Sequence, residues 1–410
     1  MPPSGATPSW LKKADSSEYR TKAIRMLTQR EGIRADFRNT SRQSNLPQSA
    51  ESEYYSVATG AHKDNRQRNR YPDIFPYDRT RVAVDCGGVC GPEGRYLNAS
   101  WVREMHGGKW WIAQQAPKDV TMHAFITMLL QPTAFPPEKL LSRPHAKPSD
   151  KSRVRTVVQL TPIVEGRYQS ASAHSYFPTK ADDEPHIFVP DEGLAAPRYK
   201  LSLVSSEELN EAHAVQSVVS IQPISSSGQD IGPASIFTHF FFTDWPDKGI
   251  PADSSLPGLM KFMHLVDESN RDVTTQPSDS RADLDPDPPI MVNCSAGVGR
   301  SGTFIALFSL FRDAGLIPPT TSILNDPSSP TPSLPPTLLG PLPSEYAEDK
   351  VVQEIDALRE QRLFMVQTKA QAEMIYRVLK LAYEPNTIQA KSKKLKDVDH
   401  STRVSDTTTA

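Results

Sequence analysis

Residues 288–303, Pro-Pro-Ile-Met-Val-Asn-Cys-Ser-Ala-Gly-Val-Gly-Arg-Ser-Gly-Thr, constrain the fold more than any other stretch of this chain. The apolar run at 290–292 predicts a buried strand, and the apolar residues from Phe304 to Phe311 recur with helical period. Between the two segments lie Cys294 and then, before Arg300, two glycines. A strand, a tight turn and a helix N-terminus together aim backbone N–H groups and a positive dipole at one point. The stretch therefore predicts an anion site.

The side chains of this turn suit the chemistry of a phosphate ester. Cys294 lies where a nucleophile would stand, and Arg300 can donate two hydrogen bonds to one phosphate. Gly297 and Gly299 are expected to supply the positive φ that such a turn requires. Lowering a thiol pKa from about 8.5 to about 6.5 takes about 3 kcal/mol, and a helix terminus supplies only about 0.3–1 kcal/mol. We expect the backbone N–H groups and Arg300 to supply the rest. Considered without the rest of the chain, the spacing of Cys294 and Arg300 also fits a buried cysteine followed by an arginine in the first turn of a helix.

Composition limits the classes of protein that the chain can belong to. A net charge of −2 gives no electrostatic case for a nucleic-acid partner, and the longest apolar runs are too short for a membrane span. Three cysteines and the lack of a signal pattern predict a soluble protein of a reducing, cytoplasmic compartment. The cluster Lys391–Lys396 is a candidate nuclear-import or acidic-partner patch, although most such runs are solvated. The pair Cys86 and Cys90 has no second ligand pair nearby, which favours surface thiols over a metal or redox site.

Strand patterns alternate with helix patterns, so the fold class predicted is α/β. We expect one domain at 10–385, with a twisted mixed β-sheet flanked by helices and the phosphate-binding loop between a central strand and a helix. Helices are predicted at 10–34, 120–130, 257–266, 348–363 and 369–381, strands at 80–84, 96–102, 109–114, 154–160, 163–178, 198–204, 214–224, 236–245 and 290–292, and loops at 39–53, 179–197 and 225–232.

Proline marks segments that interrupt this alternation. The chain has 37 prolines among 410 residues, whereas proline usually makes up about 5% of a protein. Insertions are expected at 131–150, 267–288 and 318–343, as surface loops with possible partners of their own. Residues 1–9 and 386–410 are expected to be disordered tails.

Phosphoryl transfer also needs an acid for the leaving oxygen. Asp247 suits this role because it follows a predicted strand and Trp245-Pro246, and because Lys248-Gly249 behind it is a plausible hinge. Alone, it would be read as a turn aspartate. Trp245 would anchor the loop.

Six short motifs, in one order along the chain, resemble the tyrosine-specific branch of the cysteine-based protein tyrosine phosphatases, in a non-receptor-like form with a single catalytic domain. They are Asn69-Arg70-Tyr71-Pro72-Asp73, Tyr96-Leu97-Asn98-Ala99-Ser100, Gln114-Gln115-Ala116-Pro117, Trp245-Pro246-Asp247, Cys294–Thr303 and Gln367-Thr368-Lys369-Ala370-Gln371. Each motif is modest by itself, and six in order form a strong match.

The resemblance implies a role for each matching residue. Cys294 would attack phosphorus and carry a phosphocysteine intermediate, Asp247 would act as acid and then base, and Ser301 would ease departure of the sulfur. Arg300 and the loop Ser295, Ala296, Gly297, Val298 and Gly299 would bind the phosphate oxygens. Gln367, with Gln371 beside it, would hold the attacking water, Tyr71 would set the pocket depth that selects phosphotyrosine, Asp73 would hold substrate backbone, and Glu165 would pair with Arg300. The partners implied are phosphotyrosine-containing proteins, and no cofactor or metal is needed.

The chain also departs from the family pattern. Asn293 stands where the family usually has histidine, Lys248 replaces an aromatic residue, Ala116 replaces a glycine, and Arg167 is the only basic candidate for a lysine expected after Glu165. Asn293 predicts a less favoured thiolate. It leaves open a weakly active or inactive relative that only binds phosphotyrosine. A phosphatase of broader specificity would conflict with Tyr71, and a sulfurtransferase would leave Asp247 and Gln367 without a role.

Overall fold

The computed structural model of the chain describes residues 6–43, 49–85, 94–131, 152–165, 170–171, 173–246, 249–276, 281, 284–322 and 337–384. For residues 164, 165, 170 and 171 it describes the backbone alone. Within these ranges, no helix combines the length and the apolar character that crossing a bilayer requires.

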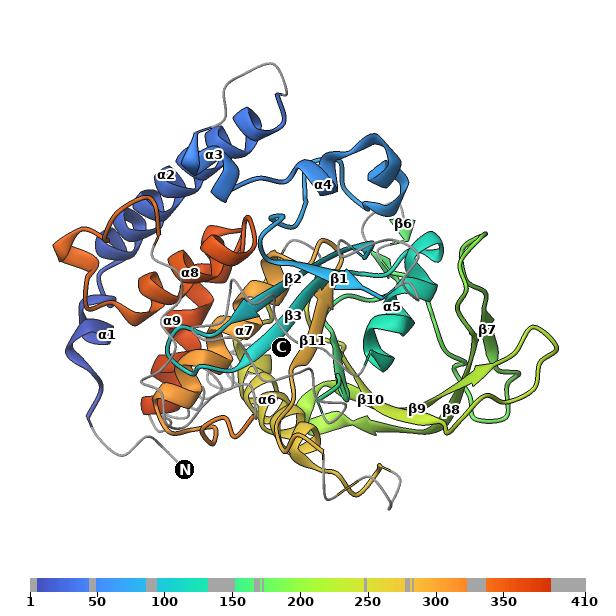
Figure 1. The fold of residues 1–410 in the computed structure, drawn as a ribbon. Coiled ribbons are helices and arrows are strands. Elements are labelled where there is room, and N and C mark those ends of the chain that lie inside the picture. The colour runs from blue at the N-terminus through green and yellow to red at the C-terminus, as the bar shows by residue number, and fades with distance from the viewer. Residues whose placement is uncertain are drawn as a thin grey trace, which may run out of the picture.

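The strands of the described residues are β1 Arg81–Val84, β2 Arg95–Arg103, β3 Trp110–Gln115, β4 Thr156–Gln159, β5 Val164–Glu165, β6 Ser170–Ala171, β7 His186–Phe188, β8 Arg198–Leu209, β9 Ala214–Ile224, β10 Ser235–Phe242 and β11 Ile290–Cys294. Nine of them form one sheet in the order β1-β2-β3-β11-β4-β10-β9-β8-β7 (Figure 1). The central strand β11 is parallel to β3 and β4, and β4 is parallel to β10, whereas the outer pairs are antiparallel. The predicted mixed sheet of an α/β fold is confirmed.

The helices are α1 Ser9–Lys13, α2 Ser17–Ser41, α3 Ala50–Tyr54, α4 Ala58–Ala61, α5 Met122–Leu130, α6 Leu256–Arg271, α7 Gly299–Asp313, α8 Lys350–Gln361 and α9 Lys369–Tyr383, with short 3-10 turns η1 Lys63–Arg68, η3 Asp119–Thr121, η5 Asn210–Ala212, η6 Asp253–Ser255 and η8 Ser344–Tyr346. Polar residues cap three of the helices: the side chains of Ser16, Asp349 and Thr368 accept N–H groups of the first turns of α2, α8 and α9. In Figure 1, α7, α8 and α9 lie together on one side of the central strands, and the β7–β9 arm extends away from them.

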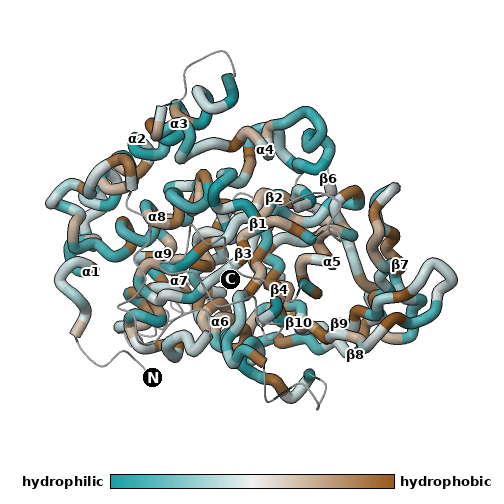
Figure 2. Tube along the Cα trace, in the orientation of Figure 1, coloured by the Kyte–Doolittle hydropathy of each residue, from teal (hydrophilic) through white to brown (hydrophobic). Residues whose placement is uncertain are grey.

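The two faces of the sheet carry separate cores because side chains alternate along each strand. On β3, Trp111 and Ala113 pack with residues of α6, α7, α8 and α9, whereas Ile112 packs with residues of α5. Figure 2 shows hydrophobic residues gathered around α5 and the central strands, with hydrophilic residues along the outer loops. Strand β11 contributes to both cores, and the segment that follows it, from Cys294 to Phe311, packs into the core that contains Trp111.

Helix α7 differs from the amphipathic helix that its apolar period predicts. Every residue from Gly299 to Arg312 is buried. Its polar side chains are paired inside the protein: Ser309 donates to Glu354 (2.5 Å), and Arg312 binds Glu104 (3.2 Å). Helix α7, which follows Cys294, is thus buried along nearly its whole length, and its packing fixes the turn before it.

Several predicted loops contain regular structure. The loop predicted at 39–53 includes the end of α2 and most of α3, and the loop at 179–197 contains β7 at the sheet edge. Conversely, the strand predicted at 163–178 reduces to β5 and β6, which form a two-stranded sheet of their own. These elements are short, so no periodic pattern in the sequence predicts them. Contacts with the rest of the fold stabilise them.

The insertion predicted at 267–288 is wrong in part. Helix α6 continues through Arg271, and the side chains of Asp285 and Asp287 are fully buried. Asp287 pairs with Lys109 and with Arg271. At the N-terminus, α1 already begins at Ser9, inside the expected tail. Residues 132–150, 323–336, 386–410 and the pair Cys86 and Cys90 lie outside the described residues.

Candidate active site

A pocket of about 230 Å³ opens where β11 ends and α7 begins. It is lined by Tyr71, Asp73, Ile74, Cys294, Ser295, Ala296, Gly299, Arg300, Gln367, Thr368 and Gln371. Three of the six sequence motifs contribute to this lining and the other three support it, although they lie far apart along the chain.

The turn after β11 presents its N–H groups to this pocket, because its carbonyls are bound from behind. The N–H of Ala116 donates to the first two carbonyls of residues 294–297, at 2.9 and 3.1 Å. The guanidinium of Arg362 donates to the last two, at 3.1 and 2.8 Å. In a trans peptide, the N–H of the next residue points away from the carbonyl. The N–H groups of residues 295–298 therefore point away from β3 and Arg362, as an anion cradle requires.

The two glycines of the turn have different reasons to be glycine. Gly297 has φ +70°, and a Cβ there would lie 2.0 Å from the carbonyl oxygen of Gln114. Gly299 does not have a positive φ, so that prediction is wrong. A side chain at Gly299 would instead press on Gln371, whose Nε2 would lie 3.0 Å from the added Cβ. Gly299 is thus needed for the close approach of the pocket wall.

Cys294 lies at the end of β11 and is 3% exposed. Burial alone would raise the pKa of its thiol. The Arg300 guanidinium, the Ser301 hydroxyl and the backbone N–H groups of Ser301 and Val298 favour the thiolate more strongly, so the pKa of Cys294 lies below its ordinary value. Arg300 and the backbone N–H groups thus stabilise the thiolate, as the sequence predicts, and the Ser301 hydroxyl contributes as well.

Arg300 connects the pocket to the segment that carries the predicted acid. It is 6% exposed, and its Nη1 donates to the carbonyl of Trp245 at 3.4 Å. The indole Nε1 of the buried Trp245 donates to the carbonyl of Gly249 at 3.2 Å and so joins the two ends of this loop. Asp247 and Lys248, which lie between them, are outside the described residues. So is the side chain of Glu165, the expected partner of Arg300.

The Tyr71 motif forms one wall of the pocket. Tyr71 is 37% exposed, and its hydroxyl lies 2.7 Å from the hydroxyl of Ser295. Its position is set by two neighbours: the Arg70 N–H donates to Gln115 Oε1 at 2.8 Å, and Asn69 accepts from the Tyr96 hydroxyl at 2.6 Å. The motifs around residues 69, 96 and 114 therefore support one another in space.

The opposite wall comes from the turn before α9. Gln371 closes a capping box with Thr368: it receives the Thr368 N–H on Oε1 at 3.1 Å and donates its own N–H to the Thr368 hydroxyl at 3.2 Å. Val366, just before Gln367, has φ +55°, a rare conformation for a β-branched residue. The buried Arg359 holds this turn by donating to the Val366 carbonyl at 2.8 Å.

Two arginines of the site escaped the sequence reasoning. Arg362, fully buried, also donates to Asn98 (2.8 Å) and Ser100 (3.1 Å), which explains why that motif is near the site. Arg359 holds the turn that carries Gln367. Both lie inside the helix predicted at 348–363, where arginine is common. Nothing in the residue spacing of that helix distinguishes them from surface residues.

Val298, Ser301 and Asn293 lie outside the lining of the pocket. Val298 is fully buried and contributes its backbone alone, and Ser301 lies beneath the cysteine rather than in the pocket lining. Asn293 points to the opposite face of the sheet, where its Nδ2 contacts the Met291 sulfur at 4.0 Å. Asn293 is therefore not among the residues that line this pocket.

Comparison with known proteins agrees with this geometry. The family model described as protein-tyrosine phosphatase matches residues 65–134 and 150–316. Tyrosine-protein phosphatase 1 of Saccharomyces cerevisiae is 29% identical over 336 residues, which cover 80% of this chain and 85% of the yeast protein. Human tyrosine-protein phosphatase non-receptor type 2 is 29% identical over 255 residues, 62% of this chain and 48% of the human protein. Tyrosine-protein phosphatase 2 of Schizosaccharomyces pombe is 26% identical over 330 residues, 80% of this chain and 36% of that protein.

The chain thus spans most of one of these relatives and about half or less of the other two. The family match covers the Tyr71 motif, the cysteine turn and the sheet between them, and the structure brings these parts together around one pocket. The chain is an enzyme of the protein-tyrosine phosphatase family.

Proposed function

We propose that the protein hydrolyses phosphotyrosine in proteins through a phosphocysteine intermediate. The observation that carries the proposal is the stabilised thiolate of Cys294 at the floor of a pocket that also contains Arg300. A guanidinium and backbone N–H groups favour the thiolate, which is the nucleophilic form of a cysteine.

In the first step, the Cys294 sulfur forms a bond to phosphorus as the bond from phosphorus to the aryl oxygen breaks. Asp247 gives its proton to that oxygen. The phosphoryl oxygens are held by Arg300 and by the N–H groups of the turn, which balance the charge that develops on them.

In the second step, water attacks phosphorus and the sulfur leaves. Asp247 takes the proton of this water, which the Gln367 side chain holds, and Gln371 stabilises the same wall. Ser301 supports the departing thiolate, because the interactions that lower the pKa of Cys294 also make it a good leaving group.

Substrate selection rests on the wall formed by Tyr71. A phosphate must pass this wall to reach Cys294, so an aryl phosphate is long enough and a phosphoserine is too short. Asp73, at the pocket rim, would accept N–H groups of the substrate backbone. The substrates are therefore phosphotyrosine-containing proteins, and we place the enzyme in the cytoplasm, where proline-rich segments are available to partners.

Turnover of para-nitrophenyl phosphate and of a phosphotyrosine peptide tests the proposal. Both are expected for the native chain and absent in Cys294→Ser. Asp247→Ala should retain phosphotyrosine binding and trap substrate proteins. Full para-nitrophenyl phosphate turnover by Cys294→Ser would refute the nucleophile.

The second candidate is a weakly active or inactive module that binds phosphotyrosine, and Asn293 is the observation that favours it. Phosphotyrosine binding by the native chain without turnover at any pH would decide for this candidate.

A further inference from the structure

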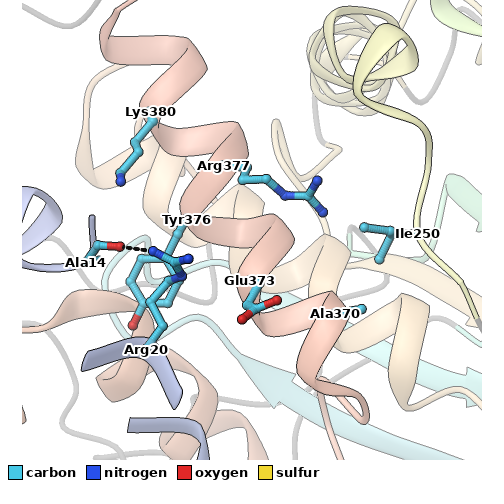
Figure 3. A pocket seen from close by; sticks show the side chains of 8 residues that line it. All are labelled: Ala14, Arg20, Ile250, Ala370, Glu373, Tyr376, Arg377 and Lys380. Carbon is cyan, nitrogen blue, oxygen red and sulfur yellow. Dashed lines mark hydrogen bonds between the residues drawn. The ribbon is translucent and has the colours of Figure 1, made fainter. Parts of the chain in front are cut away.

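A second pocket, larger than the catalytic one, lies on the outer side of α9. Its volume is about 440 Å³, against about 230 Å³ for the catalytic pocket. Figure 3 shows three cationic side chains, Arg20, Arg377 and Lys380, around Tyr376, with Ile250 on the far side. Glu373 is the single acidic side chain of the lining.

The pocket is distinct from the catalytic site although the same helix borders both. At 100° per residue, Glu373, Arg377 and Lys380 lie on the side of α9 that faces away from Gln371. Gln371 contributes to the catalytic pocket, whereas these three residues line the second pocket. A ligand here would leave the catalytic cradle open.

The cations are placed by the fold. Arg20 comes from α2, and its guanidinium is held by the carbonyls of Ala14 and Asp15, the latter at 3.0 Å. Arg377 and Lys380 are one turn apart on α9. Helices that pack together by their apolar faces thus bring three positive charges to one opening.

The carboxylates now paired with these cations can be replaced. Arg377 Nη1 lies 2.7 Å from Asp253, and Lys380 pairs with Asp15. The side chains of Asp253 and Asp15 are 73% and 71% exposed. Exposed ion pairs are weak, about 0–1 kcal/mol each, so an incoming anion competes with them readily.

The two segments on either side of 337–384, which lie outside the described residues, contain few acidic residues. The segment that continues from α9, residues 385–410, contains five Lys or Arg residues and three Asp residues, so its net charge is positive. Residues 323–336 contain one Asp. Charge complementarity therefore points to an occupant from another molecule.

We propose that this pocket is a docking site for an acidic segment of a protein partner. Its carboxylates would pair with Arg377, Lys380 and Arg20, and its aliphatic stems would contact Tyr376 and Ile250. The site goes beyond the proposed phosphatase activity and does not depend on it. Because Ile250 is three residues from Asp247, a partner bound here would touch the root of the predicted acid loop.

Fluorescence anisotropy with a labelled hexaglutamate peptide tests the proposal, with a hexaglutamine peptide for comparison. Arg377→Gln and Lys380→Gln should each weaken hexaglutamate binding about three- to tenfold, as expected for one charge-assisted contact. Asp253→Asn should strengthen it about two- to fivefold, because the competing carboxylate is gone. Lys180→Gln, which removes an exposed positive charge from the segment before β7, is the matched control and should leave binding unchanged.

Equal binding to all four variants, or equal weakening by Lys180→Gln, would overturn the proposal, as would binding to hexaglutamine. Loss of binding in Arg300→Lys but not in the α9 variants would place the peptide in the catalytic cradle and also overturn it. Far-ultraviolet circular dichroism checks that each variant is folded. Turnover of para-nitrophenyl phosphate, measured separately, reports on the proposed function and does not enter this result.

Discussion

Gly297→Ala tests whether the cradle is packed against β3 as the structure describes. Gly297 has φ +70°, which costs a residue with a Cβ about 1–2 kcal/mol. The new Cβ would also lie 2.0 Å from the Gln114 carbonyl oxygen and 2.6 Å from the Gln115 nitrogen. Relieving this overlap requires a backbone shift in a packed core, which costs about 1–3 kcal/mol. Alanine also offsets about 0.4–1 kcal/mol of this cost, because it lowers the entropy of the unfolded chain, so the expected net loss of stability is about 1–4.5 kcal/mol.

Gly315 provides a matched control. It also has φ +70°, but an added Cβ would meet no atom within 4 Å. Gly315→Ala therefore carries the conformational cost without the overlap, and the expected loss is about 0–1.5 kcal/mol. The difference between the two variants measures the contact between the cradle and β3.

Urea unfolding gives both free energies, and para-nitrophenyl phosphate turnover reports on the cradle. A displacement of about 1 Å at the reacting centre costs about 100-fold in rate, so Gly297→Ala should lose at least that much and Gly315→Ala almost nothing. If the two variants are equally stable and equally active, the cradle does not press on β3 and the geometry assigned to residues 295–298 is wrong.

Other substitutions test the parts around the cradle. Arg362→Met leaves buried carbonyls unpaired and should cost at least about 1–3 kcal/mol in urea unfolding; a loss below about 1 kcal/mol would contradict its role in holding the turn. Ser301→Ala should raise the pKa of Cys294, which moves iodoacetate alkylation to higher pH; an unmoved profile would exclude the hydroxyl. Asn293→His should move that alkylation to lower pH if the missing histidine weakens the thiolate, and an unchanged profile refutes the idea. Burial raises the pKa of Glu354 to about 8, so the folded protein keeps a proton that the unfolded chain releases above about pH 4.3. Stability should therefore fall as pH rises toward 8, and Glu354→Gln should remove this slope; a slope that persists points to other groups.

The centre of the site could be predicted from the sequence because its determinants are local. A buried strand, a turn with glycines and a helix start fix the direction of the N–H groups within ten residues, and Cys294 and Arg300 follow from that turn. The reason for Gly299 could not be predicted, because it depends on Gln371, which approaches from a distant segment. Arg362 was missed for the same reason: its acceptors lie in the cradle and on β2.

The segment at 267–288 shows that an acidic composition does not by itself predict a surface loop. An acidic stretch with prolines is typical of a solvated loop, but Asp287 is fully buried beside Lys109, which is itself buried. Burial alone would raise the pKa of Asp287, and the charges of Lys109 and Arg271 outweigh it, so the pKa lies well below its usual range. Asn270 Nδ2 donates to the same carboxylate at 2.9 Å. A carboxylate with three such partners is tied to α6 and to Lys109 directly before β3, and removing the Lys109 charge would break a buried ion pair, at a cost of up to about 3–5 kcal/mol. The segment thus anchors the chain directly before β11, so the charges that suggested a loose insertion help to fix the strand that carries Cys294.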